Sequence, residues 1–326
     1  MSMFTRRAAL AAASVLASTS GRAQARWQAA SGFAEGNYHT RNLRQFTNEV
    51  RDATASALDV TLHPNGSLLP QPQIKRGVQQ GQVQVGEILL TAYANEDALF
   101  DLDQVPGVVT SMADVRRLMA VRQPMIAQRL ARQGMELLYL APWPFVGIAS
   151  QAPLPGPEAF RGLRLRSYSA ISTRFAALMG ANGVLVPAPE VAQAFASGMV
   201  QAQLTTAPVA ADTSVWDHAR VFTLLNVATS NNAVFANQRA MQALPAVQQE
   251  AVRAAAGRAA ERAWAMAEEA QNIALSRMRE RGMQVLEPTP ALLAALREPS
   301  RVMTEEWVAR AGEDGQRLLT AFRAQG

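Results

Sequence analysis

Cysteine is absent from the 326-residue chain, and histidine occurs only three times, as His39, His63 and His218. Without cysteine the chain has no disulfide, no thiolate nucleophile and no thiolate zinc site. The three histidines are far apart in the sequence and none lies in an H-E-x-x-H pattern, so we expect no metal site. Aromatic residues make up only 6% of the chain, so the core has to rely on close packing of small side chains.

Motifs of several common enzyme classes are missing as well. The sequence has no G-x-S-x-G elbow, no G-x-x-x-x-G-K-S/T loop and no G-x-G-x-x-G after an expected strand. Carboxylates are plentiful, but no two of them form a pair that we can assign to acid–base catalysis. These absences lower the expectation of an enzyme without excluding one, and they give no reason to expect a cofactor.

The first 25 residues have the pattern of an export signal. Arg6 and Arg7 precede the apolar run Ala8–Ala17, and Ala23-Gln24-Ala25 is a typical cleavage site. The paired arginines also resemble a twin-arginine signal, which would mean export after folding. A membrane anchor is the alternative, but the apolar run is too short to span a bilayer comfortably. No later run of about 18 apolar residues exists, so we expect the mature protein to be soluble.

Removal of that segment nearly balances the charge. The formal net charge of the whole chain is +5. Without Arg6, Arg7 and Arg22, 28 basic residues stand against 26 acidic ones, which leaves +2. A charge this small provides no extended field for a polyanion, so we expect no nucleic-acid partner.

What remains is typical of a folded α/β protein of two domains. Hydrophobic residues make up 49% and charged residues 17% of the chain. Short apolar segments alternate with amphipathic ones, which predicts strands and helices in α/β layers. The expected strands are Trp27–Gly32, Leu58–His63, Val83–Val85, Met135–Leu140, Leu163–Arg166, Val184–Val186 and Ala202–Leu204. The expected helices are Thr40–Ser56, Pro72–Gln80, Met112–Gln133, Ala170–Met179 and Val191–Gly198.

A much longer helix is expected between Pro245 and Arg281. Apolar residues recur there at helical spacing, proline suits the first turn, and Gly282 suits the end. Such a helix would reach about 55 Å, which is enough to run along two domains. The alternative is a pair of helices broken near Gly257.

The most informative segment is Phe160–Ser169. On a strand, Leu163 and Leu165 would face the core, and Arg164 and Arg166 would face the other way. Arg166 would lie at the carboxyl end of the strand, where open α/β sheets bind ligands. A guanidinium there can bind a carboxylate through two hydrogen bonds. From the residues alone, a solvated or salt-bridged arginine is the commoner interpretation.

Several motifs, taken in order, resemble the solute receptors of TRAP transporters, the DctP-like family. Gly162-Leu163-Arg164-Leu165-Arg166 is similar to the family pattern G-l-K-I/L-R. Further similar segments, spread over the mature chain, are Gly81–Gly86, Val105–Val108, Leu178–Ala181 and Glu190–Val200. The export signal and the long helix also fit.

The resemblance implies a periplasmic-binding-protein-like fold, in which two α/β domains enclose a ligand cleft and one long helix spans both. Residues 26–147 with about 232–265 would form domain I, and residues 148–231 with about 266–326 would form domain II. Such a periplasmic receptor closes around a small organic acid and docks on a TRAP-type membrane permease. Arg166 would bind the carboxylate, while Arg164 would point away.

Six more residues are candidates for the cleft. Thr205 stands where many family members have a ligand-binding asparagine, and Ser169 ends the segment that contains Arg166. Asn37 and Tyr38 follow the first strand, although Tyr38 also suits a helix start. Glu87 could accept hydrogen bonds from a ligand, and a surface or hinge position is equally expected. Trp143 lies near the expected domain crossing and could wall the cleft or pack the hinge.

The region before the arginine motif, Trp143–Gly147, has no basic residue, so we expect no ligand that needs two arginines, such as a sialic acid. Asn231 and Asn232 lie where the chain should return to domain I, and we expect turn residues there. The favoured hypothesis is a non-enzymatic carboxylate receptor that feeds a permease. An exported enzyme and a receptor that reports to a membrane sensor are the alternatives.

Overall fold

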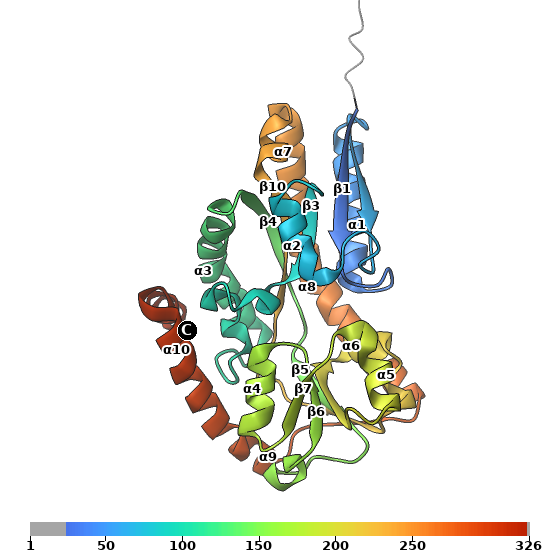
Figure 1. Ribbon diagram of the computed structural model, residues 1–326, viewed down its shortest axis with the longest axis vertical. Coiled ribbons are helices and arrows are strands. Elements are labelled where there is room, and N and C mark those ends of the chain that lie inside the picture. The colour runs from blue at the N-terminus through green and yellow to red at the C-terminus, as the bar shows by residue number, and fades with distance from the viewer. Residues whose placement is uncertain (1–23, 325–326) are drawn as a thin grey trace, which may run out of the picture.

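Two β-sheets with helices packed against them form the protein in this computed structural model (Figure 1). The structure describes residues 24–324. The expected signal peptide lies outside the described residues except for Gln24 and Ala25, and Ala25 already pairs with Leu58 in the first sheet. Within residues 24–324, no helix combines the length and the hydropathy needed to cross a membrane.

The first sheet has five strands in the order β2-β1-β3-β10-β4. These strands are β1 (Ala25–Ser31), β2 (Leu58–His63), β3 (Val85–Leu89), β4 (Met135–Pro142) and β10 (Asn231–Asn237). β1 is parallel to β2 and β3, whereas β10 is antiparallel to both β3 and β4. β10 therefore enters the sheet between strands that precede it by some hundred residues of sequence.

The second sheet has six strands in the order β11-β9-β5-β8-β6-β7. These strands are β5 (Val146–Ser150), β6 (Arg164–Ser167), β7 (Asn182–Leu185), β8 (Ala202–Thr206), β9 (Val221–Leu224) and β11 (Gln284–Leu286). β6 is parallel to β7 and β8, and β5 is antiparallel to β8 and β9. The carboxyl ends of β6, β7 and β8 consequently lie at one edge of this sheet.

Helices pack against both sheets. The α-helices are α1 (Tyr38–Ala53), α2 (Gln71–Gln79), α3 (Met112–Ala131), α4 (Ala170–Leu178), α5 (Val191–Ala196), α6 (Ala207–Asp212), α7 (Gln238–Ala243), α8 (Ala246–Glu280), α9 (Pro290–Ala295) and α10 (Arg297–Arg323). Short 3-10 turns are η1 (Leu90–Tyr93), η2 (Ala98–Phe100), η3 (Leu102–Gln104), η4 (Pro157–Phe160), η5 (Ala188–Glu190) and η6 (Val215–Asp217).

The packing of α1 on the first sheet shows how the apolar pattern builds the core. Leu43, Phe46 and Val50 recur on one face of α1, and all three are buried. Along β2, buried Leu58 and Val60 alternate with more exposed neighbours, as expected for a strand with one face in the core. These side chains belong to one continuous hydrophobic cluster.

Two adjacent segments connect a strand of one sheet directly to a strand of the other. Residues 143–145 lead from β4 to β5, and residues 225–230 lead from β9 back to β10. The two segments bond to each other: Trp143 N–H donates to Ser230 O at 2.9 Å, and Val146 N–H donates to Ala228 O at 2.9 Å. The two connections therefore run as a bonded pair.

The long helix is continuous, and the alternative of a break at Gly257 is wrong. α8 has 35 residues and begins directly after Pro245. Its first half, including Val252 and Ala259, packs on the first sheet, and Leu275 and Met278 in its second half pack on the second sheet. Figure 1 shows the same helix passing both sheets. This contact with both cores is what a helix that joins two domains requires.

Two expectations near the crossing need correction. The expected strand Val83–Val85 is in fact β3, Val85–Leu89, and the sequence analysis did not predict the strands β5, β9, β10 and β11. Asn231 and Asn232 are not turn residues, because they begin β10 and are buried between β3 and β4. Their amide nitrogens donate to the buried Asp103 and Glu87, which offsets part of the usual cost of burying asparagine. Asn231 Oδ1 has no hydrogen bond among the described residues.

Gly257→Ala should stabilise the protein by about 0.5–1 kcal/mol, because alanine loses less backbone entropy than glycine in a helix. A Cβ at this position would meet no atom within 4 Å. Urea unfolding measures the change. In the control, Gly147→Ala, the new Cβ would lie 2.6 Å from the Phe222 ring, so this variant should be destabilised. A destabilised Gly257→Ala protein would contradict the continuous helix.

Candidate functional site

Arg166 lies near the carboxyl end of β6 and is almost completely buried, with 3% of its surface exposed. Its Nε donates to Val186 O at 2.9 Å, and its Nη1 donates to Leu204 O at 3.1 Å. Among the described residues, no hydrogen bond uses Nη2. Two main-chain carbonyls thus fix the plane of the guanidinium and leave one nitrogen available.

Among the described residues, the charge of Arg166 has no acidic partner. Within residues 24–324, no carboxylate lies within 4.0 Å of its guanidinium, so it is neither the solvated nor the salt-bridged arginine of the commoner interpretation. Burial lowers the pKa of Arg166 to about 10, against a smaller opposing effect of Tyr168, so the side chain stays charged at neutral pH. A buried charge without a counter-ion is costly, and an anionic ligand would offset that cost.

The hydroxyl groups of Thr205 and Ser169 differ in their hydrogen bonds. Thr205 is a buried residue of β8, and its hydroxyl has no hydrogen bond within the part of the chain that the structure describes. Ser169 is the N-cap of α4, and its hydroxyl accepts a hydrogen bond from Ser172 N–H at 3.3 Å. The hydroxyl of Ser169 thus holds the helix start, while that of Thr205 is free to bind.

Glu87 is the centre of a buried polar network on β3. Ser31 Oγ donates to its Oε2 at 2.6 Å, and Asn232 Nδ2 donates to its Oε1 at 3.1 Å. His39 Nδ1 lies 3.7 Å from the same carboxylate. Burial raises the pKa of Glu87, and the two donors partly oppose this. The expectation of a surface position is wrong for Glu87, because the side chain is 1% exposed.

Trp143 and Tyr38 pack beside this network. Trp143 Nε1 donates to Asn232 Oδ1 at 2.8 Å, and its ring lies 4.2 Å from His39 and 5.4 Å from Tyr38, centroid to centroid. The Tyr38 hydroxyl donates to Pro142 O at 2.6 Å. Both polar groups are therefore used inside the protein, and the two rings provide packing at the crossing.

Asn37 joins the two halves of the molecule. It is the N-cap of α1, where its Oδ1 accepts from His39 N–H, and its Nδ2 donates to Asp212 Oδ2 at 2.9 Å. Asp212 ends α6, the helix that follows Thr205 and Thr206 directly. Val209 of α6 also packs on the cluster of Tyr38, Trp143 and Ala267. The start of α1 and the end of α6 are thus held close together.

The structure brings the candidates into two groups. Asn37, Tyr38, Glu87 and Trp143 form one cluster at the first sheet, while Arg166, Thr205 and Ser169 lie at the carboxyl edge of the second. Sequence reasoning missed Ser31, Asn232 and His39, which complete the first group, although Ser31 ends the first expected strand. It also missed Tyr168, whose ring lies 5.5 Å from the Arg166 guanidinium.

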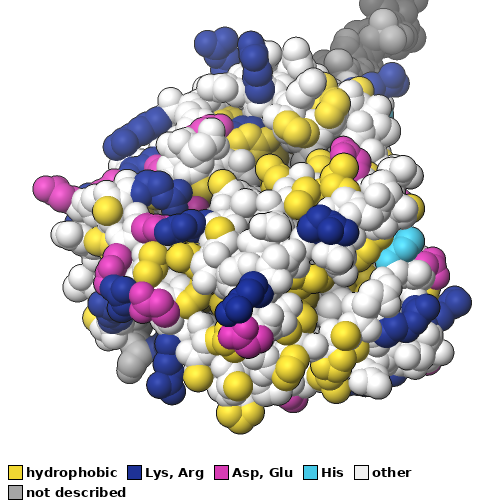
Figure 2. Space-filling view, turned by 60° about the horizontal axis from the view of Figure 1, so that its bottom comes forward, with side chains coloured by type: hydrophobic (Ala, Val, Ile, Leu, Met, Phe, Trp, Pro, Cys, Tyr) yellow, Lys and Arg dark blue, Asp and Glu magenta, His cyan; other side chains and the backbone are white. Residues whose placement is uncertain are grey.

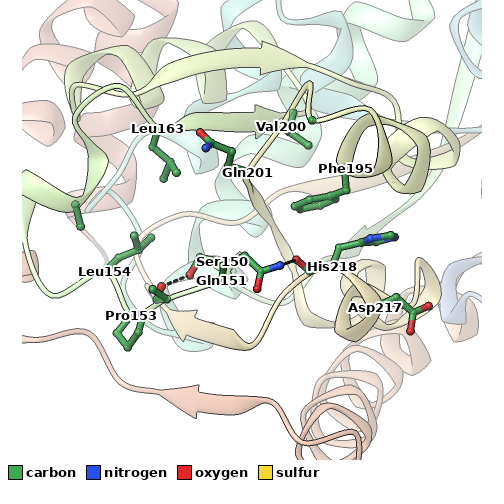
Figure 3. Close-up of a pocket in the computed structure, with 13 residues that line it drawn as sticks. Ser150, Gln151, Pro153, Leu154, Leu163, Phe195, Val200, Gln201, Asp217 and His218 are labelled. Carbon is green, nitrogen blue, oxygen red and sulfur yellow. Dashed lines mark hydrogen bonds between the residues drawn. The ribbon is translucent and has the colours of Figure 1, made fainter.

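A separate surface hollow of about 550 Å³ lies at the opposite ends of β6 and β8 (Figure 3). The rings of Phe195 and His218 are nearly parallel on one side, and Leu154 and Leu163 lie across from them. Gln151 donates to His218 O, so this amide is already bonded. None of the seven candidate residues lines this hollow, and it contains no buried unpaired charge among its described residues.

The surface charge is mixed in sign. Figure 2 shows one face of the molecule, on which Lys and Arg side chains alternate with Asp and Glu and with apolar patches. Several exposed charges of the protein form ion pairs, such as Arg174 with Glu306 and Arg301 with Glu298. This face therefore carries no extended field of one sign.

Paired crossings and one long helix join the two sheets, as in a two-domain solute-binding fold. Arg166 lies at the carboxyl edge of one sheet and has no acidic partner among the described residues. Residues 30–311 match DctP, the bacterial extracellular solute-binding protein family 7. The chain belongs to this family, which confirms the expected fold class and the resemblance to TRAP solute receptors. The family and the similar structures are binding proteins, and they carry the argument against an enzyme.

Two solved structures are similar over almost the whole chain. One is DctP7 of Bordetella pertussis, an extracytoplasmic solute receptor that binds pyroglutamic acid, with 39% identity, a TM-score of 0.89 and coverage of 91% of this chain and 99% of that one. The other is a TRAP solute-binding protein from an unidentified marine microbe, specific for pyroglutamate, with 30% identity, a TM-score of 0.88 and coverage of 92% and 99%.

A curated relative matches over a shorter range. It is a solute-binding protein of Albidiferax ferrireducens, 23% identical over 173 residues, or 53% of this chain. The alignment spans 51% of that relative, so this chain covers about half of its length.

Glu87→Gln tests the buried carboxylate through the pH dependence of stability. Because folding raises the pKa of Glu87, this group stabilises the fold below its ordinary pKa of 4.5, and that contribution is lost as pH rises through the folded value. We expect the free energy of unfolding to shift in favour of Glu87→Gln as the pH rises above the ordinary glutamate pKa of 4.5. Urea titrations at a series of pH values measure it.

Glu49→Gln is the control with the opposite sign. Burial raises the pKa of Glu49, but Arg258 and Arg262 lower it overall. This variant should therefore lose stability relative to wild type as pH rises. If the difference in unfolding free energy between wild type and Glu87→Gln stayed constant with pH, the raised pKa of Glu87 would be contradicted.

Proposed function

We propose that this protein is a periplasmic receptor that binds pyroglutamate, or a small cyclic carboxylate of similar shape, and delivers it to a TRAP-type permease. Residues 1–25 would direct export, by the twin-arginine route if the paired arginines act as such. The observation that carries the proposal is the buried, charged Arg166 without a carboxylate partner among the described residues. The pyroglutamate ligands of two receptors with 39% and 30% identity give the ligand class.

The chemistry of the two groups suits such a ligand. The available Nη2 of Arg166 would donate to the ligand carboxylate, a charge-assisted hydrogen bond that is among the stronger ones in proteins. Pyroglutamate also carries a neutral lactam with one N–H donor and one carbonyl acceptor. The free hydroxyl of Thr205 can donate or accept one hydrogen bond with it.

Capture would proceed by closure of the two domains, with domain I at residues 26–147 and about 232–265, and domain II at residues 148–231 and about 266–326. Contacts of one ligand with both domains favour the closed form by as much as the ligand binds it better. The hydrogen bond between Asn37 and Asp212 joins α1 to α6 at this place. The closed complex would then dock on the permease.

Arg166→Ala should weaken pyroglutamate binding severely, because loss of one partner of a buried charge pair costs about 2–5 kcal/mol. This corresponds to roughly 30-fold or more in Kd, measured by isothermal titration calorimetry. Arg166→Lys should also fail, because an ammonium does not reproduce the planar guanidinium. Arg164→Ala, at an exposed residue of the same strand, is the matched control and should bind within about twofold of wild type. Unchanged binding in Arg166→Ala would remove the assignment.

Selectivity tests the ligand class separately. Proline has the same ring size and carboxylate as pyroglutamate but carries a cationic amine in place of the lactam. Since Arg166 and Thr205 provide no buried acid for that cation, we expect proline to bind at least about tenfold more weakly, because a buried unpaired charge is costly. Competition calorimetry compares the two ligands. Equal affinity for both would contradict recognition of the lactam.

A further inference from the structure

Tyr168 connects Arg166 to another part of the molecule. Its ring lies 5.5 Å from the guanidinium carbon of Arg166, a distance at which a cation and an aromatic face attract each other. The hydroxyl of Tyr168 donates to Gln104 Oε1 at 2.7 Å. Tyr168 follows β6 directly, whereas Gln104 ends η3, between β3 and α3. The phenol thus spans from the arginine to a distant segment of the chain.

Gln104 is in turn fixed to the chain crossings. Its Nε2 donates to Thr229 O, so both ends of its amide are bonded. The Thr229 hydroxyl donates to Trp143 O at 2.6 Å, and Thr229 N–H donates to Asp103 O at 2.9 Å. Thr229 and Trp143 belong to the two paired crossing segments. One continuous set of bonds therefore leads from the crossings through Gln104 to Tyr168.

The surroundings of Gln104 and Tyr168 are apolar. Both residues line a small cavity whose other walls include Val146, Phe175 and Leu225. Hydrogen bonds are stronger where little water competes for them. Burial also raises the pKa of the Tyr168 phenol, which keeps it protonated, and therefore a donor, at neutral pH.

We propose that Tyr168 and Gln104 are positioning residues that hold the Arg166 guanidinium and tie it to the chain crossings, so that affinity for the carboxylate depends on a phenol hydroxyl that is bonded away from the ligand. This inference rests on the proposed role of Arg166 as the carboxylate anchor. Nε and Nη1 of Arg166 are occupied by carbonyls, so a small rotation of the guanidinium would redirect Nη2, its available nitrogen. The Tyr168 ring, tethered through Gln104, opposes that rotation.

Hydrogen exchange of the Arg166 Nε–H reports the tether directly, without any ligand. Its NMR signal is assigned by its disappearance in Arg166→Lys. In Tyr168→Phe, which keeps the ring and loses the hydroxyl, we expect exchange to become about tenfold faster, and Gln104→Leu should have at least the same effect. Tyr93→Phe is the matched control, because Tyr93 also has a bonded hydroxyl and a cation 5.5 Å from its ring, that of Lys75. This control should leave the Arg166 signal unchanged.

Calorimetry with pyroglutamate measures the consequence for binding. We expect Tyr168→Phe to weaken binding by about 3- to 10-fold, the range that the loss of one hydrogen bond gives. The double variant Tyr168→Phe/Gln104→Leu should bind no more weakly than Gln104→Leu alone, since the two residues act through one bond.

The outcomes separate this inference from the proposed function. If Arg166→Ala loses pyroglutamate but Tyr168→Phe and Gln104→Leu keep wild-type exchange of the Arg166 Nε–H, the inference alone is overturned. The same holds if both variants bind pyroglutamate within twofold of wild type. If Arg166→Ala binds as wild type does, the anchor assignment fails, and the inference fails with it.

Discussion

The return of the chain from the second sheet to the first is the constraint on which the site depends. β10 enters the first sheet between β3 and β4, and the segment before it bonds to the segment that leads out. This insertion places Asn232 beside Glu87 and Trp143, and Asn231 beside Asp103. Without it, the carboxylate of Glu87 would keep only Ser31 as a hydrogen-bond donor, and the tryptophan at the crossing would lose the partner of its ring nitrogen.

Glu87 and Arg166 are both buried ionisable groups, and their surroundings differ. Glu87 accepts hydrogen bonds from two neutral donors and lies 3.7 Å from His39, but burial raises the pKa of Glu87 and lowers that of His39. Arg166 donates hydrogen bonds to two main-chain carbonyls, and its guanidinium lies over the ring of Tyr168. Dipoles orient a guanidinium but do not neutralise it. At the first sheet the carboxylate thus has neutral hydrogen-bond donors, while among the described residues the guanidinium at the second sheet has no carboxylate partner.

The sequence predicts those features that depend on local pattern. The position of Arg166 follows from strand alternation, and the extent of α8 follows from helical spacing between Pro245 and Gly282. It does not predict β10, because two consecutive asparagines look like a turn unless their buried partners are known. Nor does it show that the Tyr38 hydroxyl bonds to Pro142 O, a carbonyl 104 residues away in sequence, instead of facing a ligand. Donor and acceptor types can be read from a sequence, but long-range pairing cannot.

The buried face of α8 consists largely of alanine, including Ala255, Ala259, Ala263, Ala267 and Ala274. Methyl groups interlock less deeply than leucine or phenylalanine side chains, so such a face presents a shallow relief to the elements on both sides. Small shifts of neighbouring elements along such a helix would therefore break few contacts between large, interlocking side chains. The low aromatic content of the chain thus has a mechanical side: if the proposed closure moves one domain along α8, the same small residues that allow close packing would offer little steric resistance to that movement.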